Sequence, residues 1–232
     1  MPMHIGALAI YDPSTAPGGH VRFKDILAYF AARLHKARSF RQRLARVPLG
    51  ADRPYWIEDR DFDLEYHIRH IALPRPGDWR QLCIQAARLH ARPLDMRRPL
   101  WEVTVVEGLD NVAGVPPGSF ALVSKFHHAA VDGVSATEIA AAFHELEAVG
   151  DPGKPDAPWR PERVPGEAEL LGRAALTTLR KPIEMAGFLR STAPRLVRTG
   201  VALARGDARW PSKVPRTRFN GPISPHRVFD AR

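Results

Sequence analysis

Two adjacent histidines, His127 and His128, are the residues best suited to chemistry, and they lie in residues 125–133 (KFHHAAVDG). A neutral imidazole titrates near neutral pH, so it can take a proton from a hydroxyl group and return it to a leaving group. Asp132 follows closely, and an acid beside a histidine often orients it. Gly133 permits a close approach that a side chain would forbid. This pattern indicates general-base catalysis at the end of a strand.

The residue types alone leave two other interpretations open. The histidines are also compatible with polar residues that merely end a strand. A metal site from His127, His128 and Asp132 is the second alternative, although it lacks a convincing further ligand. Adjacent residues of a strand point to opposite sides, so the two histidines share a cavity only if the strand has already ended.

The elements that must position these residues alternate between strands and helices. The patterns predict strands at residues 4–11, 55–58, 66–73, 100–106 and 120–126. They predict helices at residues 24–38, 79–92 and 133–148. This mixture is typical of a layered α/β or α+β domain.

Two of these helices have distinct signatures. For residues 24–38 we expect one apolar face and one basic face, made respectively by Ile26, Leu27, Phe30 and Leu34 and by Arg33, Lys36 and Arg38. For residues 79–92, Asp78 and Gln81 predict a capping box at the start of the helix.

The composition changes at Gly150. Residues 150–166 contain five spaced prolines and indicate an extended linker. Two helices are expected after it, at residues 167–181 and 183–205, with a kink or a break at Pro194. The second is strongly basic, which fits packing on a partner domain, attachment to a membrane surface or contact with coenzyme A phosphates.

Bulk properties narrow the class of protein. The 232 residues are 44% hydrophobic and carry a net charge of +9, which favours anionic partners. Nucleic acid is not expected, because no DNA- or RNA-binding motif is visible and the basic residues are not interleaved with aromatic ones. Cys83, the single cysteine, is expected to be a buried hydrophobic residue. No uninterrupted apolar stretch is long enough to span a bilayer.

Several segments together resemble one enzyme family. Residues 127–133 match the HHxxxDG motif of CoA-dependent acyltransferases. Residues 92–102 (RPLDMRRPLWE) resemble the PLDxxRPLWE segment of bacterial wax ester synthase/diacylglycerol acyltransferases. Residues 215–222 (PRTRFNGP) are similar to that family's segment after the linker, and His4-Ile5-Gly6 fits its first strand.

This resemblance implies a fold and an order of domains. The implied fold class is α/β, an α+β layered sandwich that resembles chloramphenicol acetyltransferase and forms the N-terminal domain of a CoA-dependent acyltransferase. Residues 1–149 would form that domain, residues 150–166 the linker, and residues 167–232 a helical crossover leading to a C-terminal acyltransferase domain. The Asn-Asp pair and the Asn-Val-Pro-Gly segment of that second domain do not occur in this sequence.

The resemblance also implies an activity. The enzyme would move a long-chain acyl group directly from acyl-CoA to diacylglycerol or a long-chain alcohol, with His128 as the general base. His127 would support the loop, Asp132 would brace it through an arginine that the sequence does not identify, and Gly133 would leave room for substrate. A condensation-type acyltransferase and a non-catalytic acyl-CoA- or lipid-binding module are the alternatives.

Other implied roles concern binding. Pro99, Leu100, Trp101 and Asn220 would contact substrate, although Trp101 fits equally well as a core residue. Acyl-CoA would be a co-substrate, with no further cofactor and no metal. A cytoplasmic location on the inner membrane or on lipid droplets is expected from the basic surface.

Overall fold

The computed structural model describes residues 3–131, 143–144, 153, 159–205, 217 and 228–230. Contacts divide the chain into two units. The first comprises residues 1–45, 56–164 and 224–232, and the second comprises residues 46–55 and 165–223.

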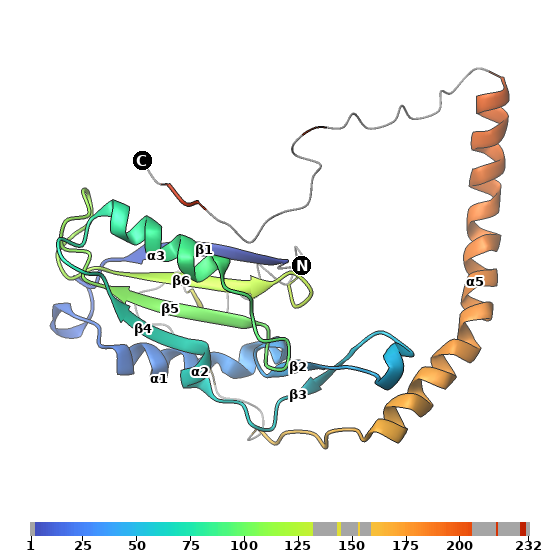
Figure 1. Cartoon of the computed structure of the whole chain (residues 1–232), viewed down its shortest axis with the longest axis horizontal. Helices are drawn as coiled ribbons and strands as arrows, with labels where there is room; N and C mark the ends of the chain where they lie inside the picture. Colours follow the sequence, from blue (N-terminus) through green and yellow to red (C-terminus); the bar gives the residue numbers. More distant parts are fainter. Residues whose placement is uncertain are drawn as a thin grey trace. The chain divides into compact units, whose positions relative to one another are not determined.

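A four-stranded sheet forms the frame of the first unit (Figure 1). Its order is β1-β6-β5-β4, with bounds His4–Tyr11, Phe120–His127, Trp101–Glu107 and Ile68–Ala72. Strand β6 runs antiparallel to both of its neighbours, and β4 is parallel to β5. The inner strand β5 contains three valines and one threonine, which suit a strand packed on both faces.

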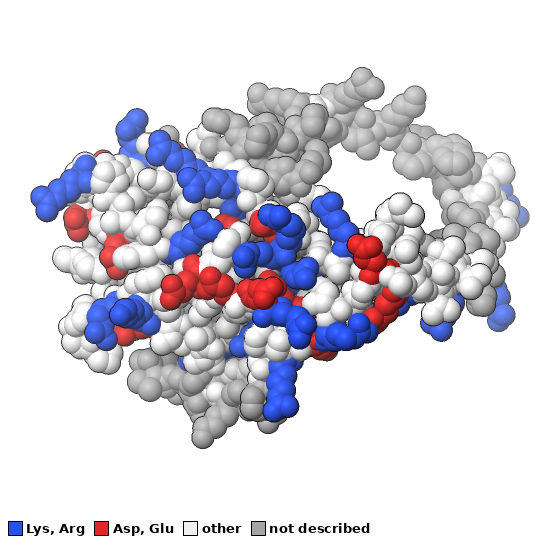
Figure 2. Space-filling model, turned by 60° about the horizontal axis from the view of Figure 1, so that its bottom comes forward, with Lys and Arg blue, Asp and Glu red and all other residues white. Residues whose placement is uncertain are grey.

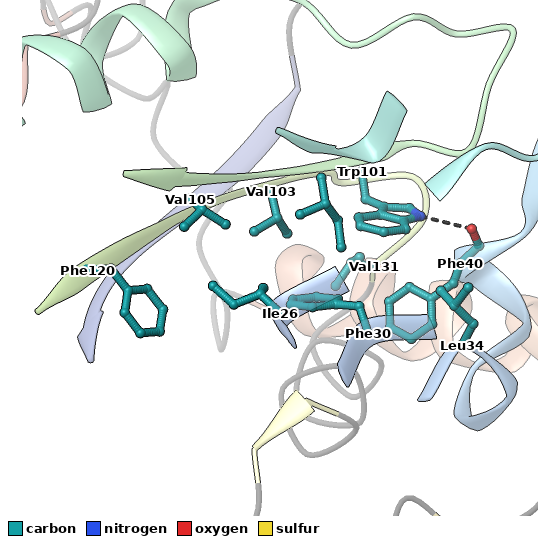
Figure 3. Packing of buried hydrophobic residues seen from close by; sticks show 10 residues of the cluster. Ile26, Phe30, Leu34, Phe40, Trp101, Val103, Val105, Phe120 and Val131 are labelled. Carbon is teal, nitrogen blue, oxygen red and sulfur yellow. Dashed lines mark hydrogen bonds between the residues drawn. The ribbon is translucent and has the colours of Figure 1, made fainter. Parts of the chain in front are cut away.

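Helices cover both faces of this sheet (Figure 1). Helix α1 (Phe23–Arg33) packs on the face that carries Trp101, Val103, Val105 and Phe120, as Figure 3 shows. Helix α3 (Trp79–Ala91) packs on the opposite face, where Val106, Ala121 and Val123 are buried. The predicted layered α/β architecture is therefore confirmed.

Helix α3 begins as its sequence predicts. The side chain of Asp78 accepts a hydrogen bond from the Gln81 backbone at 2.8 Å, and the Gln81 side chain accepts one from the Asp78 backbone at 3.2 Å. This reciprocal pair satisfies N–H groups that the first turn would otherwise leave without partners. Cys83 lies in this helix and is buried, as expected.

Helix α1 differs from its prediction in length and in its buried face. It ends at Arg33 and is followed by two short 3-10 turns, Leu34–Lys36 and Arg38–Phe40. Arg33 is only 3% exposed, so its assignment to the basic outer face was wrong. It follows Ile26 by two helical turns, and residues at that spacing share a face.

The remaining elements before helix α5 are short. Strand β2 (Gln42–Ala45) pairs with β3 (Tyr55–Glu58), and a 3-10 turn covers Pro17–Gly19. The strand expected from residue 66 begins at Ile68, because helix α2 (Leu64–His67) comes first. Asp63 caps that helix by accepting a hydrogen bond from the Glu65 backbone at 3.0 Å.

One long helix dominates the second unit. Helix α5 (Glu167–Ala204) has 38 residues and continues through Pro182 and Pro194, so the expected pair of helices is a single one. Each proline removes one backbone hydrogen bond, and Figure 1 shows the helix bending along its length. Its first turns bury Leu170 and Ala174 against Val47, next to the 3-10 turn Pro48–Gly50.

Two further sequence predictions can be compared with only part of the chain. The helix expected at residues 133–148 lies outside the described residues except for Phe143 and His144. Among the helices that the structure describes, none combines the length and the hydrophobicity needed to cross a membrane.

Candidate functional site

Strand β6 ends at His127, so His128 is the first residue beyond the sheet. The His127 N–H donates to the carbonyl oxygen of Leu100 at 2.9 Å, and the His128 N–H donates to that of Met3 at 2.7 Å. A turn follows, closed by the Ala130 N–H on the carbonyl oxygen of His127 at 2.9 Å. The backbone of both histidines is thus held by two other segments, while the His128 side chain is exposed.

The two histidine side chains have different surroundings. His127 is half-buried, and its Nδ1 accepts a hydrogen bond from the Ala129 N–H at 3.1 Å. Burial lowers the pKa of His127, and the nearby His4 and His128 lower it further. A neutral ring that accepts at Nδ1 carries its proton on Nε2. His127 therefore stabilises the turn that presents His128.

Lys125, two residues before His127, is a buried charged residue that the sequence analysis did not single out. It is 4% exposed, and its ammonium group lies 3.1 Å from Oε2 of Glu102. It also donates to the carbonyl oxygens of Leu89 at 3.1 Å and Arg92 at 2.9 Å, at the C-terminal end of helix α3. A cation is favourable there because the last carbonyl groups of a helix lack backbone partners. The only sequence signal is a lysine inside an apolar strand.

The residues of the Pro-Leu-Trp segment belong to the core. Leu100 and Trp101 are 0% and 2% exposed, and the Trp101 indole N–H donates to the carbonyl oxygen of Phe40 at 2.9 Å (Figure 3). Pro99 is also buried, and its carbonyl oxygen accepts a hydrogen bond from the Trp101 N–H at 2.9 Å. The core interpretation of Trp101 fits this geometry, and direct contact of these residues with substrate stays a prediction.

His67, also missed by the sequence analysis, lies beneath this segment. Its ring stacks on Trp101 with centroids 4.6 Å apart, and its Nδ1–H donates to the carbonyl oxygen of Trp101 at 2.7 Å. Nε2 is buried without a hydrogen-bond partner. Burial lowers the pKa of His67, so the ring is neutral near pH 7. The role of His67 is structural, because its ring and its hydrogen bond support the start of β5.

Three predicted site residues, Asp132, Gly133 and Asn220, lie outside the described residues. Val131, directly before Asp132, is buried in the same cluster as Phe30 and Leu34 of the α1 region. Arg33 lies between those two residues in the sequence. Its guanidinium carbon is 3.6 Å from the ring centroid of Tyr29.

Each face of the sheet has a cavity. A small one of about 110 Å³ on the α3 side is lined by residues including Glu102 and Lys125. A larger one of about 660 Å³ lies on the α1 side and is lined by residues including Ile26, Phe126 and Arg33. Phe126 precedes His128 by two residues, so the larger cavity is next to the turn that carries the histidines.

Charge and metal-ligand patterns do not suggest another kind of site. Figure 2 shows Lys and Arg side chains interleaved with acidic ones over one face of the molecule. Within the described part of the chain, no three His, Cys, Asp or Glu side chains gather as a metal site would require. The alternative metal site made of His127, His128 and Asp132 includes one residue, Asp132, that lies outside the described residues.

Comparison with known proteins identifies the family. Residues 1–232 match the model of the wax ester synthase/diacylglycerol acyltransferase catalytic domain. The chain belongs to this family. Its members are acyltransferases, so the resemblance seen in the HHxxxDG and PLDxxRPLWE segments is confirmed, and this chain is a wax ester synthase/diacylglycerol acyltransferase domain.

Individual relatives differ in how much of them this acyltransferase chain covers. It is 37% identical to "Probable diacyglycerol O-acyltransferase tgs3" of Mycobacterium tuberculosis H37Rv, over 98% of the chain and 83% of the relative. It is 35% identical to the tgs2 protein of M. tuberculosis CDC 1551 over 94% of the chain, but spans only 46% of tgs2. A solved wax ester synthase/diacylglycerol acyltransferase from Marinobacter aquaeolei VT8 is 39% identical over 60% of the chain and 33% of that structure, with a TM-score of 0.45.

Proposed function

We propose that this chain supplies the general base, His128, for transfer of a long-chain acyl group from acyl-CoA to the hydroxyl group of diacylglycerol or of a long-chain alcohol. The observation that carries the proposal is the different placement of the two histidines. The His127 ring accepts a hydrogen bond at Nδ1 from its own turn. The His128 ring is exposed, and the backbone that carries it is hydrogen-bonded to two other segments of the chain.

The chemistry needs one proton carrier. His128 removes the proton from the acceptor hydroxyl as its oxygen attacks the thioester carbonyl, and a C–O bond forms. The tetrahedral oxyanion requires hydrogen-bond donors. Its collapse breaks the C–S bond, and coenzyme A leaves as a thiol after taking the proton from the His128 imidazolium. The acyl group passes directly to the acceptor, so no nucleophilic side chain is needed.

We further infer that Arg33 is the arginine partner of Asp132. A buried charge is strongly unfavourable unless an opposite charge or hydrogen bonds compensate it, and Arg33 is buried. Val131, which directly precedes Asp132, is buried in the same cluster as Leu34, the residue after Arg33. The pair would fix the start of the segment after the histidine turn.

Helix α5 supports a proposal of peripheral attachment to an anionic lipid surface on the cytoplasmic side. Its exposed residues include large apolar ones, namely Leu176, Leu179, Val197 and Val201. Arg190 and Arg198 are exposed on the same helix. Apolar and basic residues together are typical of helices that lie on membranes or lipid droplets. A C-terminal acyltransferase domain is the other partner we propose for this region.

The decisive experiment compares His128→Ala with His127→Ala in the full-length protein. Acyl transfer to dioleoylglycerol and to hexadecanol is measured together with coenzyme A release, detected by a thiol reagent. We expect His128→Ala to lower turnover by about 10²-fold or more. His127→Ala should act through loss of the turn and should therefore also lower the melting temperature. Exposed His20 offers a control, His20→Ala, that should leave turnover unchanged.

Unchanged turnover in His128→Ala would remove this residue from the mechanism. Binding of acyl-CoA by the wild type without acyl transfer to either acceptor would instead support a non-catalytic lipid-binding module. Transfer to an amine but to neither alcohol would support a condensation-type acyltransferase.

A further inference from the structure

We propose that the cavity of about 660 Å³ between helix α1 and the sheet holds the alkyl chain of a substrate, with the reacting end of that substrate at His128. The inference rests on the proposed function for the chemistry at His128. Binding of the chain can be tested independently of that chemistry.

The cavity has the size and the lining of a hydrocarbon site. Small-molecule sites enclose roughly 300–1,000 Å³ and are lined mainly by apolar and aromatic side chains. Strand β6 contributes alternate residues to one wall, and α1 contributes Ile26 and Phe30 to the other. The β6 residues are Phe120, Leu122, Ser124 and Phe126.

This row of β6 residues gives the cavity a direction. Phe120 and Phe126 are six residues apart, which corresponds to roughly 20 Å along a strand. Such a length matches an extended long-chain alkyl group rather than a short acyl group. Members of the row are two residues apart, and His128 follows Phe126 by the same spacing. The strand itself ends at His127, one residue before His128. A chain lying along the row therefore has one end near His128.

An aromatic group marks the opposite end. Tyr11 and Phe120 are partners in the register of β1 and β6, and their rings stack with centroids 5.4 Å apart. The Tyr11 hydroxyl is hydrogen-bonded to Nε2 of His144 at 2.6 Å. Burial, together with the nearby Tyr29, raises the pKa of Tyr11, so this end carries no tyrosinate at neutral pH. A chain that reaches these rings meets a neutral aromatic wall.

Several polar groups of the lining already have partners within the protein. The Tyr29 hydroxyl donates to the carbonyl oxygen of Phe143 at 3.1 Å, and the Arg33 guanidinium covers the Tyr29 ring. The Asp25 carboxylate binds Arg22, with an oxygen-to-nitrogen distance of 3.1 Å. These contacts engage the polar groups of Tyr29 and Asp25, and most of the other lining residues are apolar, so the wall presents mainly hydrocarbon to a ligand. Ser124 is the small member of an otherwise bulky row and leaves room beside β6.

The binding experiment uses the 232-residue chain and two homologous series. Straight-chain alcohols from octanol to octadecanol and the corresponding acyl-CoAs compete with dansyl-undecanoic acid as a fluorescent probe. We expect affinity to rise about fourfold per added methylene until the row is filled and then to level off. The chain length at which affinity stops rising is called the break. The series that shows a break identifies the chain in the cavity as that of the acceptor or that of the acyl donor.

Variants test whether the break belongs to this cavity. Ser124→Phe should move the break to shorter chains, and Phe120→Leu should move it to longer ones. Ile10→Trp is the matched control, because Ile10 is half-buried in β1 but packs on the α3 face of the sheet. Thermal unfolding confirms that each variant is folded. An unchanged break in both folded cavity variants, or an equal shift in Ile10→Trp, would overturn the proposal.

A final comparison separates this inference from the proposed function. His128→Ala should lose turnover while keeping the chain-length dependence of binding. If Ser124→Phe and Phe120→Leu leave chain binding unaltered while His128→Ala abolishes turnover, the cavity proposal fails and the general-base proposal stands. If the variants shift chain binding while His128→Ala keeps full turnover, the general-base proposal fails and the cavity proposal stands.

Discussion

The backbone N–H of His127 donates a hydrogen bond to the carbonyl oxygen of Leu100 at 2.9 Å. This bond joins the HHxxxDG motif to the Pro-Leu-Trp segment, which are distant in the sequence. Leu100 and Trp101 are buried, so the carbonyl group that they position is anchored in the core. The Pro-Leu-Trp segment can therefore influence catalysis without touching a substrate.

Leu100→Ala tests this anchor. Removal of a buried leucine side chain typically lowers the free energy of unfolding by about 2–5 kcal/mol, because a cavity remains. We also expect lower turnover in the folded variant, since the His127 backbone loses a fixed partner. Urea unfolding and acyl-transfer assays provide the two measurements. Leu49→Ala, at a residue that is 98% exposed, should change stability by less than about 0.5 kcal/mol.

The pair of Lys125 and Glu102 should behave as a buried ion pair. Lys125→Met leaves the Glu102 carboxylate and two carbonyl oxygens without their donor, and we expect a loss of about 3–5 kcal/mol in the free energy of unfolding. Lys125→Met combined with Glu102→Leu should recover part of that loss, because no charge remains unpaired. Chemical denaturation of both variants decides this, and a double variant less stable than the single one would contradict it.

Stability should fall as the pH drops below about 6.5, the ordinary pKa of histidine. The pKa of folded His67 lies below that value, so unfolded His67 binds a proton that folded His67 does not. Below about pH 6.5 the proton therefore favours the unfolded state, until the folded pKa is also passed. His67→Asn keeps an N–H donor for the Trp101 carbonyl but cannot titrate. It should flatten the plot of unfolding free energy against pH.

A double-mutant cycle tests the proposed pairing of Arg33 with Asp132. Arg33→Met and Asp132→Asn should each destabilise the protein and lower its turnover. Their combination should be less harmful than the sum, with a coupling of about 0.5–3 kcal/mol in the free energy of unfolding. Purely additive effects would show that Arg33 compensates a different group.

Charge reversal on helix α5 tests its attachment to lipid. Each of Arg190→Glu and Arg198→Glu should weaken binding to phosphatidylserine-containing vesicles by at least fivefold, because one basic residue near such a surface contributes about 1 kcal/mol. Sedimentation with the vesicles measures binding, and added salt should reduce the difference. Arg60→Glu, an exposed site outside the helix, is the control. Equal losses from all three changes would indicate a general charge effect.

Local patterns in the sequence predicted the family and much of the frame. The limits of β1 and β3 and the capping box at Asp78 were predicted correctly, because alternation and capping depend on residues close together in the chain. The family also followed from short motifs, since the HHxxxDG and Pro-Leu-Trp residues are read directly from the sequence.

The tertiary structure alone decided which side chains meet across elements. Two contacts join segments that are distant in the sequence, namely that of Lys125 with Glu102 and the end of α3, and the stacking of His67 on Trp101. The burial of Arg33 depends on which face of its helix the fold covers. A charged or polar side chain has the same local signature whether it is solvated or buried. Its role depends on the partners that packing brings to it, and only the fold supplies those partners.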